Sequence, residues 1–508
     1  MRVRFLLAPC RRPAVRVRAQ GCYDGALVTS TPDLISHPRR GPALLGAVIV
    51  ATVCAALLWR TTFEGRNQTF DTLLYARGLW GVANGQVWNS VVDMNTFSMH
   101  AHFGLLALAP LAWLMPAAAV LILAQVFCLG WVFLMIVRAL EPSHGTAKAL
   151  WGAGVIVASP LVLNGFLFDA RPDLLGVGFC TAALLRSRNA GFDRRAIVYL
   201  VLGTLCREEF GFVAAMALIA APTASTSNTW TLRGRIATAA GFVAYFAIYY
   251  LVVMKGLGGN TRSASMHLAE QGGAVGSELI RAKIDLAIVF ALTAGGLIWL
   301  GARWILLALP GLALLSITRW LPDMQLRFHY AMFAVPGLVL AVVAGLDRMR
   351  DMSASRRRVV MAVATVLALA NFRYGSAAPG GMRFARFNFD LGDRAGGIRF
   401  DWNRHSVGYD AVHTLLARVP RAHGLVAPWS FAAPVADRSF ITTDNALKDA
   451  VARTGKVDPR ITTVALMRED LGPLASVLQA AGFVPVGAMN APIIVVSRAP
   501  SDFGASAD

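Results

Sequence analysis

The sequence predicts a mainly α-helical, polytopic membrane bundle with a small α/β domain at its C-terminal end. Hydrophobic residues make up 56% of the 508 residues, and charged residues make up only 15%. A soluble protein carries about 25% charged residues. Here the apolar residues gather in runs that are long enough to cross a bilayer. The lipid bilayer is therefore the expected partner and the main solvent of this chain.

The net charge of +19 does not predict a nucleic-acid partner. Arg and Lys collect in short loops between the apolar runs, as the positive-inside bias of membrane proteins requires, and no nucleic-acid motif occurs. The six cysteines form no CxxC pair. We therefore expect neither a disulfide framework nor a zinc site.

The chain begins with an Arg-rich tail, residues 1–41, which we expect to be disordered in the cytoplasm. Apolar runs follow to residue 374, and this region, 42–374, is the predicted transmembrane domain. The runs cover approximately residues 42–58, 117–138, 149–166, 174–190, 196–222, 236–254, 284–301, 304–318, 329–346 and 359–374.

Two apolar stretches require a decision before the spans can be counted. Residues 103–115, which follow the outer loop 60–103, are too few to cross a core of roughly 30 Å at about 1.5 Å per residue. We predict that they form a helix lying in the membrane interface. Residues 196–222 carry Arg207, Glu208 and Glu209 at their centre. Three charges at the bilayer midplane would be very costly, so we predict two short helices that turn at 207–209.

These two choices place the Arg clusters at 186–195 and 348–358 on the side of the N-terminus. The positive-inside rule then favours eleven spans in the plasma membrane, with a cytoplasmic N-terminus and an extracytoplasmic C-terminal domain.

The composition changes after residue 374. Residues 375–408 form a predicted linker, and residues 409–508 alternate between helical and strand-like patterns. We expect helices at 409–418 and 473–481 and strands at 424–428, 439–443, 462–467 and 492–497, which together make a small α/β domain. The domain has no Gly-rich phosphate loop and no catalytic triad signature. We therefore expect it to act as a scaffold or to contact an acceptor.

In the predicted topology, polar residues from distant parts of the chain fall at the outer ends of the spans. Taken singly, each is better explained by solvation or by an ion pair within the protein, and His100 and His102 fit no metal-binding spacing. Their joint clustering favours a site. A carboxylate there can act as a general base or hold a divalent cation, and Arg or His can bind phosphate. The candidates are Asp71, His102, Asp169, Arg171, Asp173, Arg207, Glu208, Glu209, Arg327, His329 and Tyr330.

Short motifs occur in a characteristic order between residues 45 and 500. They are Phe70-Asp71, Leu79-Trp80, Ala83-Asn84-Gly85, His102-Phe103-Gly104, Leu108-Ala109-Pro110-Leu111, Phe168-Asp169-Ala170-Arg171-Pro172-Asp173, Cys206-Arg207-Glu208-Glu209, His329-Tyr330 with Pro336, Ala427-Pro428-Trp429 and Ala436-Asp437-Arg438. In these motifs the chain resembles an uncharacterised family of bacterial and archaeal multi-pass membrane proteins, a domain of unknown function. That family is similar to the glycosyltransferase C (GT-C) superfamily.

The resemblance implies a membrane enzyme that transfers a sugar from a polyprenyl-phosphate carrier at the extracytoplasmic face. It implies Asp71 as the general base, with Asp169 and Asp173 positioning the acceptor or a divalent cation. Arg207 would receive the phosphate. The chain departs from the related patterns at Thr72, where the superfamily often has a second acid. It also has Arg171-Pro172-Asp173 where the related family often has His-Pro-Glu.

Two other classes of function remain open. One is a transporter or flippase of a lipid-linked substrate, which should show helices broken near the midplane and inverted repeats. The sequence shows no such repeat. The other is a catalytically inert membrane assembly protein, which should tolerate the loss of Asp71.

Overall fold

The computed structural model describes residues 40–63, 70–220, 231–258, 276–317, 329–375, 409–486 and 493–503. Residues 1–39 of the predicted tail, nearly all of the linker and Arg327 lie outside the described residues. The backbone of His329 and Tyr330 is described, but their side chains are not.

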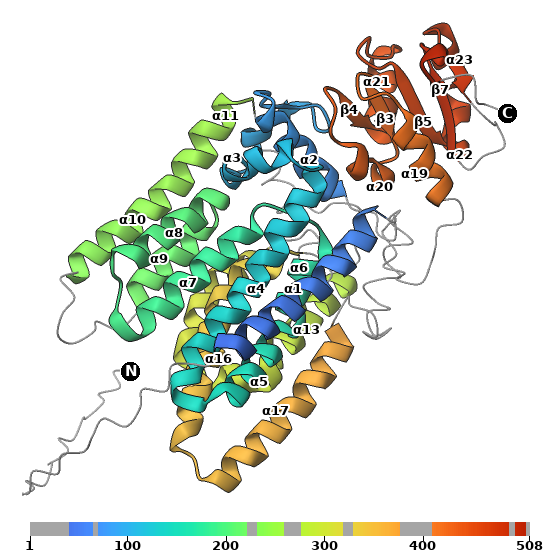
Figure 1. Cartoon of the computed structure of the whole chain (residues 1–508). Helices are drawn as coiled ribbons and strands as arrows, with labels where there is room; N and C mark the ends of the chain where they lie inside the picture. Colours follow the sequence, from blue (N-terminus) through green and yellow to red (C-terminus); the bar gives the residue numbers. More distant parts are fainter. Residues whose placement is uncertain are drawn as a thin grey trace, which may run out of the picture. The chain divides into compact units, whose positions relative to one another are not determined.

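The N-terminal part of the described chain is a bundle of helices (Figure 1). A small hairpin of β1 (Trp88–Asn89) and β2 (Met94–Asn95) follows α2. Short 3₁₀ segments cover Thr96–Ser98, Ala109–Trp113, Thr293–Ala308, His329–Ala334 and Met349–Asp351, and a π-helical turn covers Tyr249–Val253. The α-helices are α1 (Arg40–Phe63), α2 (Phe70–Ala83), α3 (Gly104–Leu108), α4 (Ala117–His144), α5 (Thr146–Val157), α6 (Pro160–Phe168), α7 (Leu174–Ala190), α8 (Arg194–Cys206), α9 (Phe210–Ala220), α10 (Leu232–Ile248), α11 (Met254–Gly256), α13 (Gly276–Ala291), α14 (Leu309–Ile317), α16 (Val335–Arg348) and α17 (Ala354–Gly375).

Several of these helices have the length and apolarity of membrane spans. Among the described residues, five meet both criteria: Gly41–Arg60, Ala117–His144, Leu232–Gly256, Thr293–Ala313 and Ala331–Asp351. The pair Thr146–Val157 and Pro160–Leu167, bent by 65°, makes a sixth if it counts as one span. The chain is therefore a polytopic helical membrane protein. The count of eleven spans stays a prediction, because helices such as α8 and α9 are individually short.

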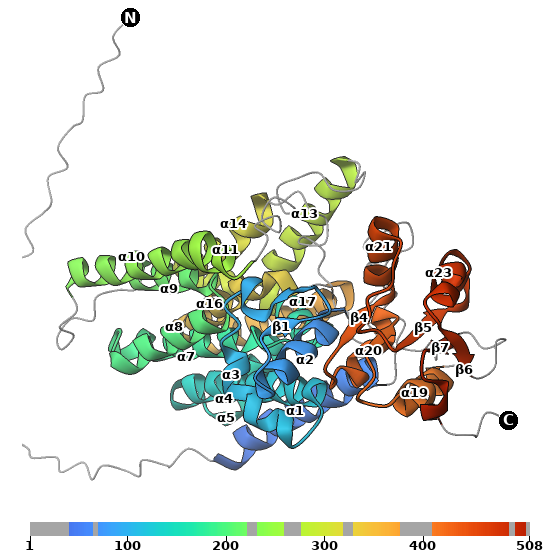
Figure 2. The same cartoon turned by 90° about the horizontal axis from the view of Figure 1, so that it is seen from above.

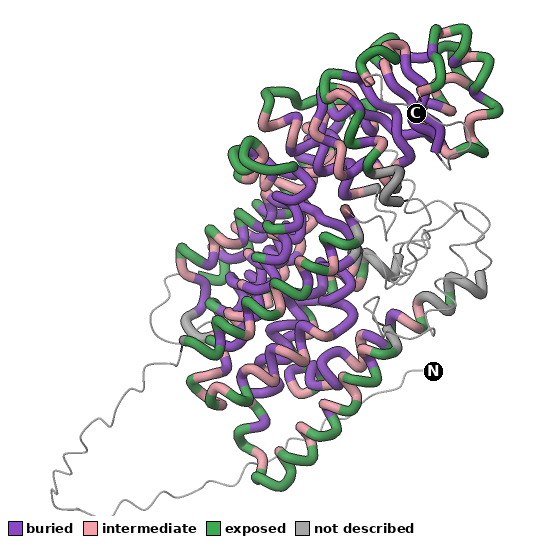
Figure 3. The backbone as a smooth tube through the Cα atoms, turned by 45° about the vertical axis from the view of Figure 1, so that its right-hand side comes forward, coloured by how far each residue is buried: buried purple, intermediate pink, exposed green. Residues whose placement is uncertain are grey.

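Helix α16 lies at the centre of the bundle. In the most apolar stretch of the span Ala331–Asp351, 83% of the residues are buried. By contrast, α1 and α17 carry many exposed residues (Figure 3). Glycines bring α16 against the segment Thr293–Ala308. A Cβ atom added to Gly301 would lie 1.9 Å from the carbonyl oxygen of Ala341, and one added to Gly337 would lie 2.4 Å from the nitrogen of Ala308. Small residues permit this close approach, which is a common basis of helix packing in membranes.

The apolar region 284–318 breaks earlier than the sequence predicts. We expected a break near Arg303, between the runs 284–301 and 304–318. The structure leaves helical geometry at Gly301, next to that break, but it turns first at Ala294, Gly295 and Gly296, which have φ of 50°, 66° and 78°. Glycine adopts such left-handed conformations at little cost. Arg303 lies within a helical span, where its guanidinium carbon sits 4.9 Å from the ring centroid of Trp304.

The two stretches that required a decision in the sequence are both short helices. Residues 103–115 form α3, Gly104–Leu108, followed by the 3₁₀ segment Ala109–Trp113. The run 196–222 divides into α8 and α9, with the chain turning at residues 207–209. The charged turn is therefore not part of a continuous helix.

The C-terminal part contains a five-stranded mixed sheet in the order β4-β3-β5-β7-β6. β3 pairs in parallel with β4 and β5, and β7 pairs antiparallel with β5 and β6. Four strands overlap the predicted ranges, and β6 and α21 were not predicted. The strands are β3 (Leu425–Ala427), β4 (Ile441–Thr443), β5 (Thr463–Met467), β6 (Val484–Val486) and β7 (Ile493–Ser497). The helices are α19 (Tyr409–Arg418), α20 (Trp429–Ala432), α21 (Asp444–Thr454), α22 (Arg468–Leu471) and α23 (Ala475–Ala480), and 3₁₀ turns cover Ala433–Val435, Gly472–Leu474 and Pro500–Phe503.

The sheet is covered on both faces, with α21 and α23 on one side and α19 and α20 on the other (Figure 2). Successive side chains of a strand point to opposite faces. Accordingly, Ile494 and Val496 of β7 join the cluster that contains Leu447 of α21, whereas Ile493 and Val495 join the cluster that extends into the bundle. This double burial explains why β7 reads as a continuous apolar run.

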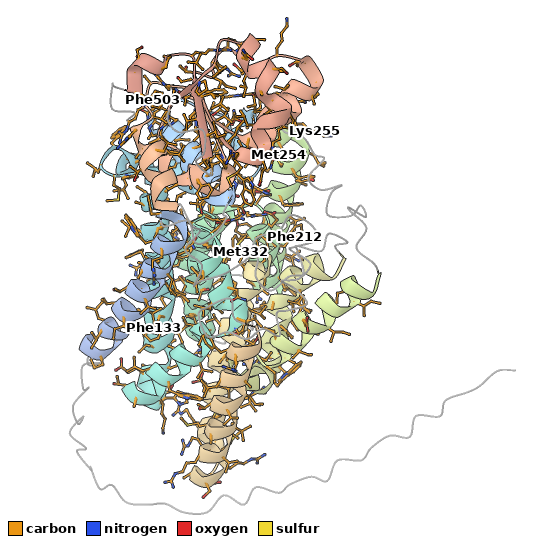
Figure 4. All side chains as sticks on the ribbon, turned by 90° about the vertical axis from the view of Figure 1, so that its right-hand side faces the viewer. Phe133, Phe212, Met254, Lys255, Met332 and Phe503 are labelled. Carbon is orange, nitrogen blue, oxygen red and sulfur yellow. The ribbon has the colours of Figure 1, made fainter. Side chains whose placement is uncertain are left out.

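Polar contacts join the sheet to the bundle. Arg77 of α2 donates from Nη2 to the carbonyl oxygen of Ser439 at 2.9 Å. The hydroxyl of Ser90 donates to the carbonyl oxygen of Ile441 at 2.6 Å and accepts from its backbone nitrogen at 3.1 Å. Burial lowers the pKa of Arg77 to about 10. In Figure 4, Phe503 marks the C-terminal domain, and Phe133 lies on α4 toward the other end of the bundle. The contacts define one end of the bundle, which we call the domain end.

Candidate functional site

Three segments that are far apart in the sequence meet at the domain end of the bundle. They are the first turns of α2, the loop 169–173 between α6 and α7, and the turn 207–209 between α8 and α9. Asp71 lies in the first turn of α2, where a negative charge is favourable. Tyr75 lies four residues later and so shares its helix face.

Arg171 is the centre of this meeting point. Its side chain is buried, and its Nη1 lies 2.5 Å from Oδ2 of Asp71. Its Nη2 donates to Oδ2 of Asp173 at 2.7 Å and to the hydroxyl of Tyr75 at 3.0 Å. A guanidinium group presents donors in a fixed plane, so Arg171 fixes the direction of both carboxylates. Asp71 is the more accessible of the two, with a quarter (25%) of its side chain exposed, whereas the Asp173 side chain is fully buried.

Arg207 joins the turn between α8 and α9 to the same cluster. Its Nη1 donates to Oδ2 of Asp173 at 2.7 Å. Its Nε and Nη2 donate to the two oxygens of Glu209, each at 3.1 Å. Bidentate pairs of this kind are strong and geometrically specific. Each guanidinium nitrogen of Arg207 therefore faces a carboxylate, and Asp173 is shared between two arginines.

The loop 169–173 is held in place by hydrogen bonds to neighbouring helices. The hydroxyl of Thr72 donates to Oδ1 of Asp169 at 3.0 Å and accepts from the nitrogen of Ala170 at 3.1 Å. Oε1 of Gln125, on α4, accepts from the nitrogen of Arg171 at 2.9 Å. Buried backbone groups need such partners, and here polar side chains from α2 and α4 supply them.

Glu208 turns away from the arginines and toward the segment that follows the β1–β2 hairpin. Its Oε1 lies 2.7 Å from Nδ1 of His100, and its Oε2 accepts from the nitrogen of Ala101 at 2.8 Å. His100 is also 3.7 Å from Oε1 of Glu209. The neighbouring His102 is fully buried, and within the described part of the chain neither of its ring nitrogens has a hydrogen-bond partner.

Burial and charge act against each other in this cluster. Burial disfavours the charged form of Glu209, but the charge and hydrogen bonds of Arg207 outweigh it and lower the pKa of the carboxyl. For Arg171, burial lowers the pKa, but Asp173, Tyr75 and Asp71 together raise it above its usual range. For His102, burial and the neighbouring His100 lower the pKa well below its usual value. The two arginines and Glu209 are therefore held in their charged forms, and His102 is neutral.

The structure brings together all but three of the residues that the sequence singles out. Asp71, Asp169, Arg171, Asp173, Arg207, Glu208, Glu209 and His102 all belong to the cluster. Arg327 and the side chains of His329 and Tyr330 lie outside the described residues. Sequence reasoning missed Gln125, although a lone polar residue in an apolar span is a recognisable signal. It noted Thr72 only as a departure from the related patterns and not as the partner of Asp169.

The arrangement offers two kinds of chemistry. Asp71 is a partly exposed carboxylate that a charged neighbour orients, which suits proton abstraction from a hydroxyl group. The group of His100, Glu208 and Glu209 places three ligand atoms within 4.8 Å of one another, and these residue types can bind a metal ion.

Comparison with known proteins gives one family and one fold. The model of a family described as predicted membrane protein (DUF2079) matches residues 67–376, which is more than half of the chain. The crystal structure of ArnT from Cupriavidus metallidurans bound to undecaprenyl phosphate is similar, with a TM-score of 0.55 and 14% sequence identity over 91% of this chain and 99% of that chain. The apo form of the same ArnT has a TM-score of 0.48 with 12% identity over the same shares of the two chains. No curated protein matches the sequence.

Proposed function

The chain belongs to the DUF2079 family of predicted membrane proteins, and we propose that it is a GT-C-type glycosyltransferase that uses a polyprenyl-phosphate-linked sugar. The ArnT-like fold supports the proposal, because the similar ArnT structure holds undecaprenyl phosphate. In the proposed reaction, an acceptor hydroxyl loses its proton to Asp71 and attacks the anomeric carbon. The bond from that carbon to the phosphate oxygen breaks, and polyprenyl phosphate leaves.

The observation that carries the proposal is the setting of Asp71. Its carboxylate is partly exposed, while the residues behind it are buried and fixed by hydrogen bonds. A general base must reach the substrate and keep its direction. Arg171 orients Asp71, and Asp173 in turn holds Arg171, so Asp173 is a positioning residue. Asp169 has the same role through Thr72.

The two arginines of the cluster are the cations proposed to attract the phosphate. Arg207 is fully paired with Glu209 and Asp173, so direct phosphate binding would require one carboxylate to give way. Arg171 pairs with Asp71, and proton uptake by Asp71 would weaken that pair as the phosphate leaves. The guanidinium of Arg171 would therefore link the protonation of Asp71 to the departure of the phosphate.

The proposal includes a membrane orientation. The domain end would face the extracytoplasmic side of the plasma membrane, the N-terminus would be cytoplasmic, and the chain would cross the bilayer eleven times. Support comes from the Arg-rich segments 186–195 and 348–358, which meet at the other end through the ion pair of Arg188 and Asp347, because basic loops favour the cytoplasm.

The decisive experiment replaces Asp71 with Asn, which keeps the shape of the side chain but removes the base. With a polyprenyl-phosphate-linked sugar as donor, we expect release of polyprenyl phosphate to fall by about 10²–10⁴-fold. The matched control is Asp93→Asn. Asp93 is exposed in the hairpin that follows α2 and has a φ of 53°, a conformation that Asn also tolerates.

Both variants should elute as folded monodisperse protein in detergent. Full turnover by folded Asp71→Asn would contradict the role of the base. If the wild-type protein releases no polyprenyl phosphate but moves the lipid-linked sugar across vesicles, the protein is a transporter. If it does neither, the inert assembly role replaces the enzyme.

A further inference from the structure

A group of possible metal ligands belongs to the same cluster as Asp71 but has no role in the proposed proton transfer. His100 comes from the segment after the β1–β2 hairpin, and Glu208 and Glu209 come from the turn between α8 and α9. Backbone hydrogen bonds hold the two segments together, since the nitrogen of Phe103 donates to the carbonyl oxygen of Leu205 at 3.0 Å. The group is therefore built on two braced segments.

The spacing of the ligand atoms fits a small tetrahedral ion. Ligands about 2.0–2.1 Å from Zn²⁺ in a tetrahedral site lie about 3.3 Å from one another. Nδ1 of His100 lies 2.7 Å from Oε1 of Glu208 and 3.7 Å from Oε1 of Glu209. These two separations lie on either side of the tetrahedral value, and all three ligand atoms lie within 4.8 Å of one another, so the side chains would draw together to bind the ion.

His102 provides a second and independent observation. Its side chain is fully buried, and neither ring nitrogen has a hydrogen-bond partner among the residues that the structure describes. Its ring packs edge-to-face against that of His100, with centroids 5.3 Å apart. A buried polar group without a partner is costly. The ring of His102 therefore lies beside a proposed ligand, in a buried polar position that the described residues do not satisfy.

The charge balance points the same way. The cluster holds five carboxylates, Asp71, Asp169, Asp173, Glu208 and Glu209, against the guanidinium groups of Arg171 and Arg207. A divalent cation bound by His100, Glu208 and Glu209 would add positive charge among these carboxylates, which is electrostatically favourable.

We propose that His100, Glu208 and Glu209 form a site for a Zn²⁺-class transition-metal ion, with the fourth position open to water. Imidazole and carboxylate ligands suit Zn²⁺, whereas Mg²⁺ and Ca²⁺ prefer all-oxygen shells. About a quarter (24%) of the His100 side chain is exposed, which gives the ion a route of entry. The ion joins the segment after the hairpin to the α8–α9 turn. The site does not depend on the proposed sugar transfer.

The test is metal binding by the full chain, without a polyhistidine tag, in detergent after dialysis against EDTA. We expect one Zn²⁺ per chain by calorimetry in the presence of excess Mg²⁺. We also expect Co²⁺ to give visible absorption bands that Zn²⁺ abolishes. His100→Gln and Glu208→Gln should each weaken Zn²⁺ binding by at least about tenfold. The matched control is His144→Gln, which changes a histidine that pairs with Asp347 at the other end of α4 and should leave Zn²⁺ binding unchanged.

The outcomes separate cleanly. A wild-type protein that binds no Zn²⁺, or one whose Zn²⁺ affinity is the same in both ligand variants, overturns the proposal. If His100→Gln does not fold, the wild-type titration and Glu208→Gln still decide. Because binding is measured without donor or acceptor, an inactive protein that binds Zn²⁺ refutes the proposed function and leaves the metal site standing.

Discussion

The two ends of helix α4 carry charged clusters that differ in burial and in sign. At the domain end, carboxylates outnumber arginines, and Asp173 is fully buried between Arg171 and Arg207. At the opposite end, Asp347 is 31% exposed, forms an ion pair with Nη1 of Arg188 at 3.0 Å and lies 3.2 Å from Nε2 of His144.

Basic groups dominate the surroundings of Asp347. Lys148 and Arg357 line a small pocket together with His144 and Trp151. The comparison teaches that charged residues alone do not mark a site. The solvation of charged groups and the positive-inside bias are enough to explain the charged residues near Asp347. At the domain end, buried charged side chains fix one another's orientation. The positive-inside bias alone does not explain that arrangement.

The largest expected effect concerns the side of the membrane on which each of these two ends lies. A reporter that is active only outside the cytoplasm should work when fused after Ser376 and fail when fused at Ser353. The reason is the Arg cluster at residues 356–358, which favours the cytoplasmic side. The complementary cytoplasmic reporter should give the reverse pattern at both positions. The opposite result at either position would remove the eleven-span topology and the extracytoplasmic site together.

The second expectation concerns the stability of the two clusters. Asp173→Asn removes the carboxylate that two buried arginines share, and breaking a buried ion pair costs about 3–5 kcal/mol. Asp347→Asn removes a partly exposed partner and should cost about 0–1 kcal/mol. The measurement is the unfolding midpoint of the purified protein in detergent, followed by tryptophan fluorescence. Equal losses in the two variants would mean that the two ends are energetically alike.

Sequence reasoning locates much of the domain-end cluster because charge in a membrane protein is sparse. Asp71, Arg171 and Arg207 are each conspicuous next to apolar runs, and topology alone assigns them to one end. The turn at residues 207–209 follows from the cost of three charges inside a bilayer. Four of the five strands in the C-terminal sheet follow from alternation and short apolar runs, and β6 does not.

The pairing within the cluster could not be predicted in this way. His100 and Glu208 are far apart in the chain, so no local metal-binding spacing marks them, and the sequence argued against zinc. The pairing of Arg207 with Glu209 and Asp173 depends on side-chain directions that only the packed turn fixes. The break at Gly295 and Gly296 was missed because an apolar run gives no sign of where its backbone turns left-handed.

A smaller effect is expected from single hydroxyl groups. Tyr75→Phe removes one hydrogen bond to Arg171, and a hydrogen bond to a charged group contributes about 1.5–3 kcal/mol. Ser143→Ala at the opposite end removes a hydroxyl that donates to the carbonyl oxygen of Leu140 at 3.1 Å and approaches Asp347 at 3.4 Å. Because that site is partly solvated, its loss should be smaller. Unfolding midpoints that fall more for Ser143→Ala than for Tyr75→Phe would reverse the comparison.

The smallest effect is expected where α4 begins at the domain end. The nitrogen of Ala117 donates to both oxygens of Asp437, at 3.2 and 3.3 Å. A helix N-terminus favours a negative charge, but burial disfavours ionisation and raises the pKa of Asp437 above its usual value. The folded protein then binds the proton more tightly than the unfolded chain. The stability from this group is therefore fully present below the unfolded pKa of about 3.9 and is lost as pH rises through the folded pKa.

Asp437→Asn mimics the protonated form and keeps an acceptor for Ala117. It should raise the unfolding midpoint slightly at pH 7, by the equivalent of less than about 1 kcal/mol, and the gain should vanish as pH approaches 4. The control is Asp449→Asn on α21, an exposed position in the same domain, which should show no such trend. A lower midpoint for Asp437→Asn at pH 7 would mean that the dipole of α4 outweighs the burial of the carboxylate. The charge of Asp437 would then help to hold the sheet against the bundle.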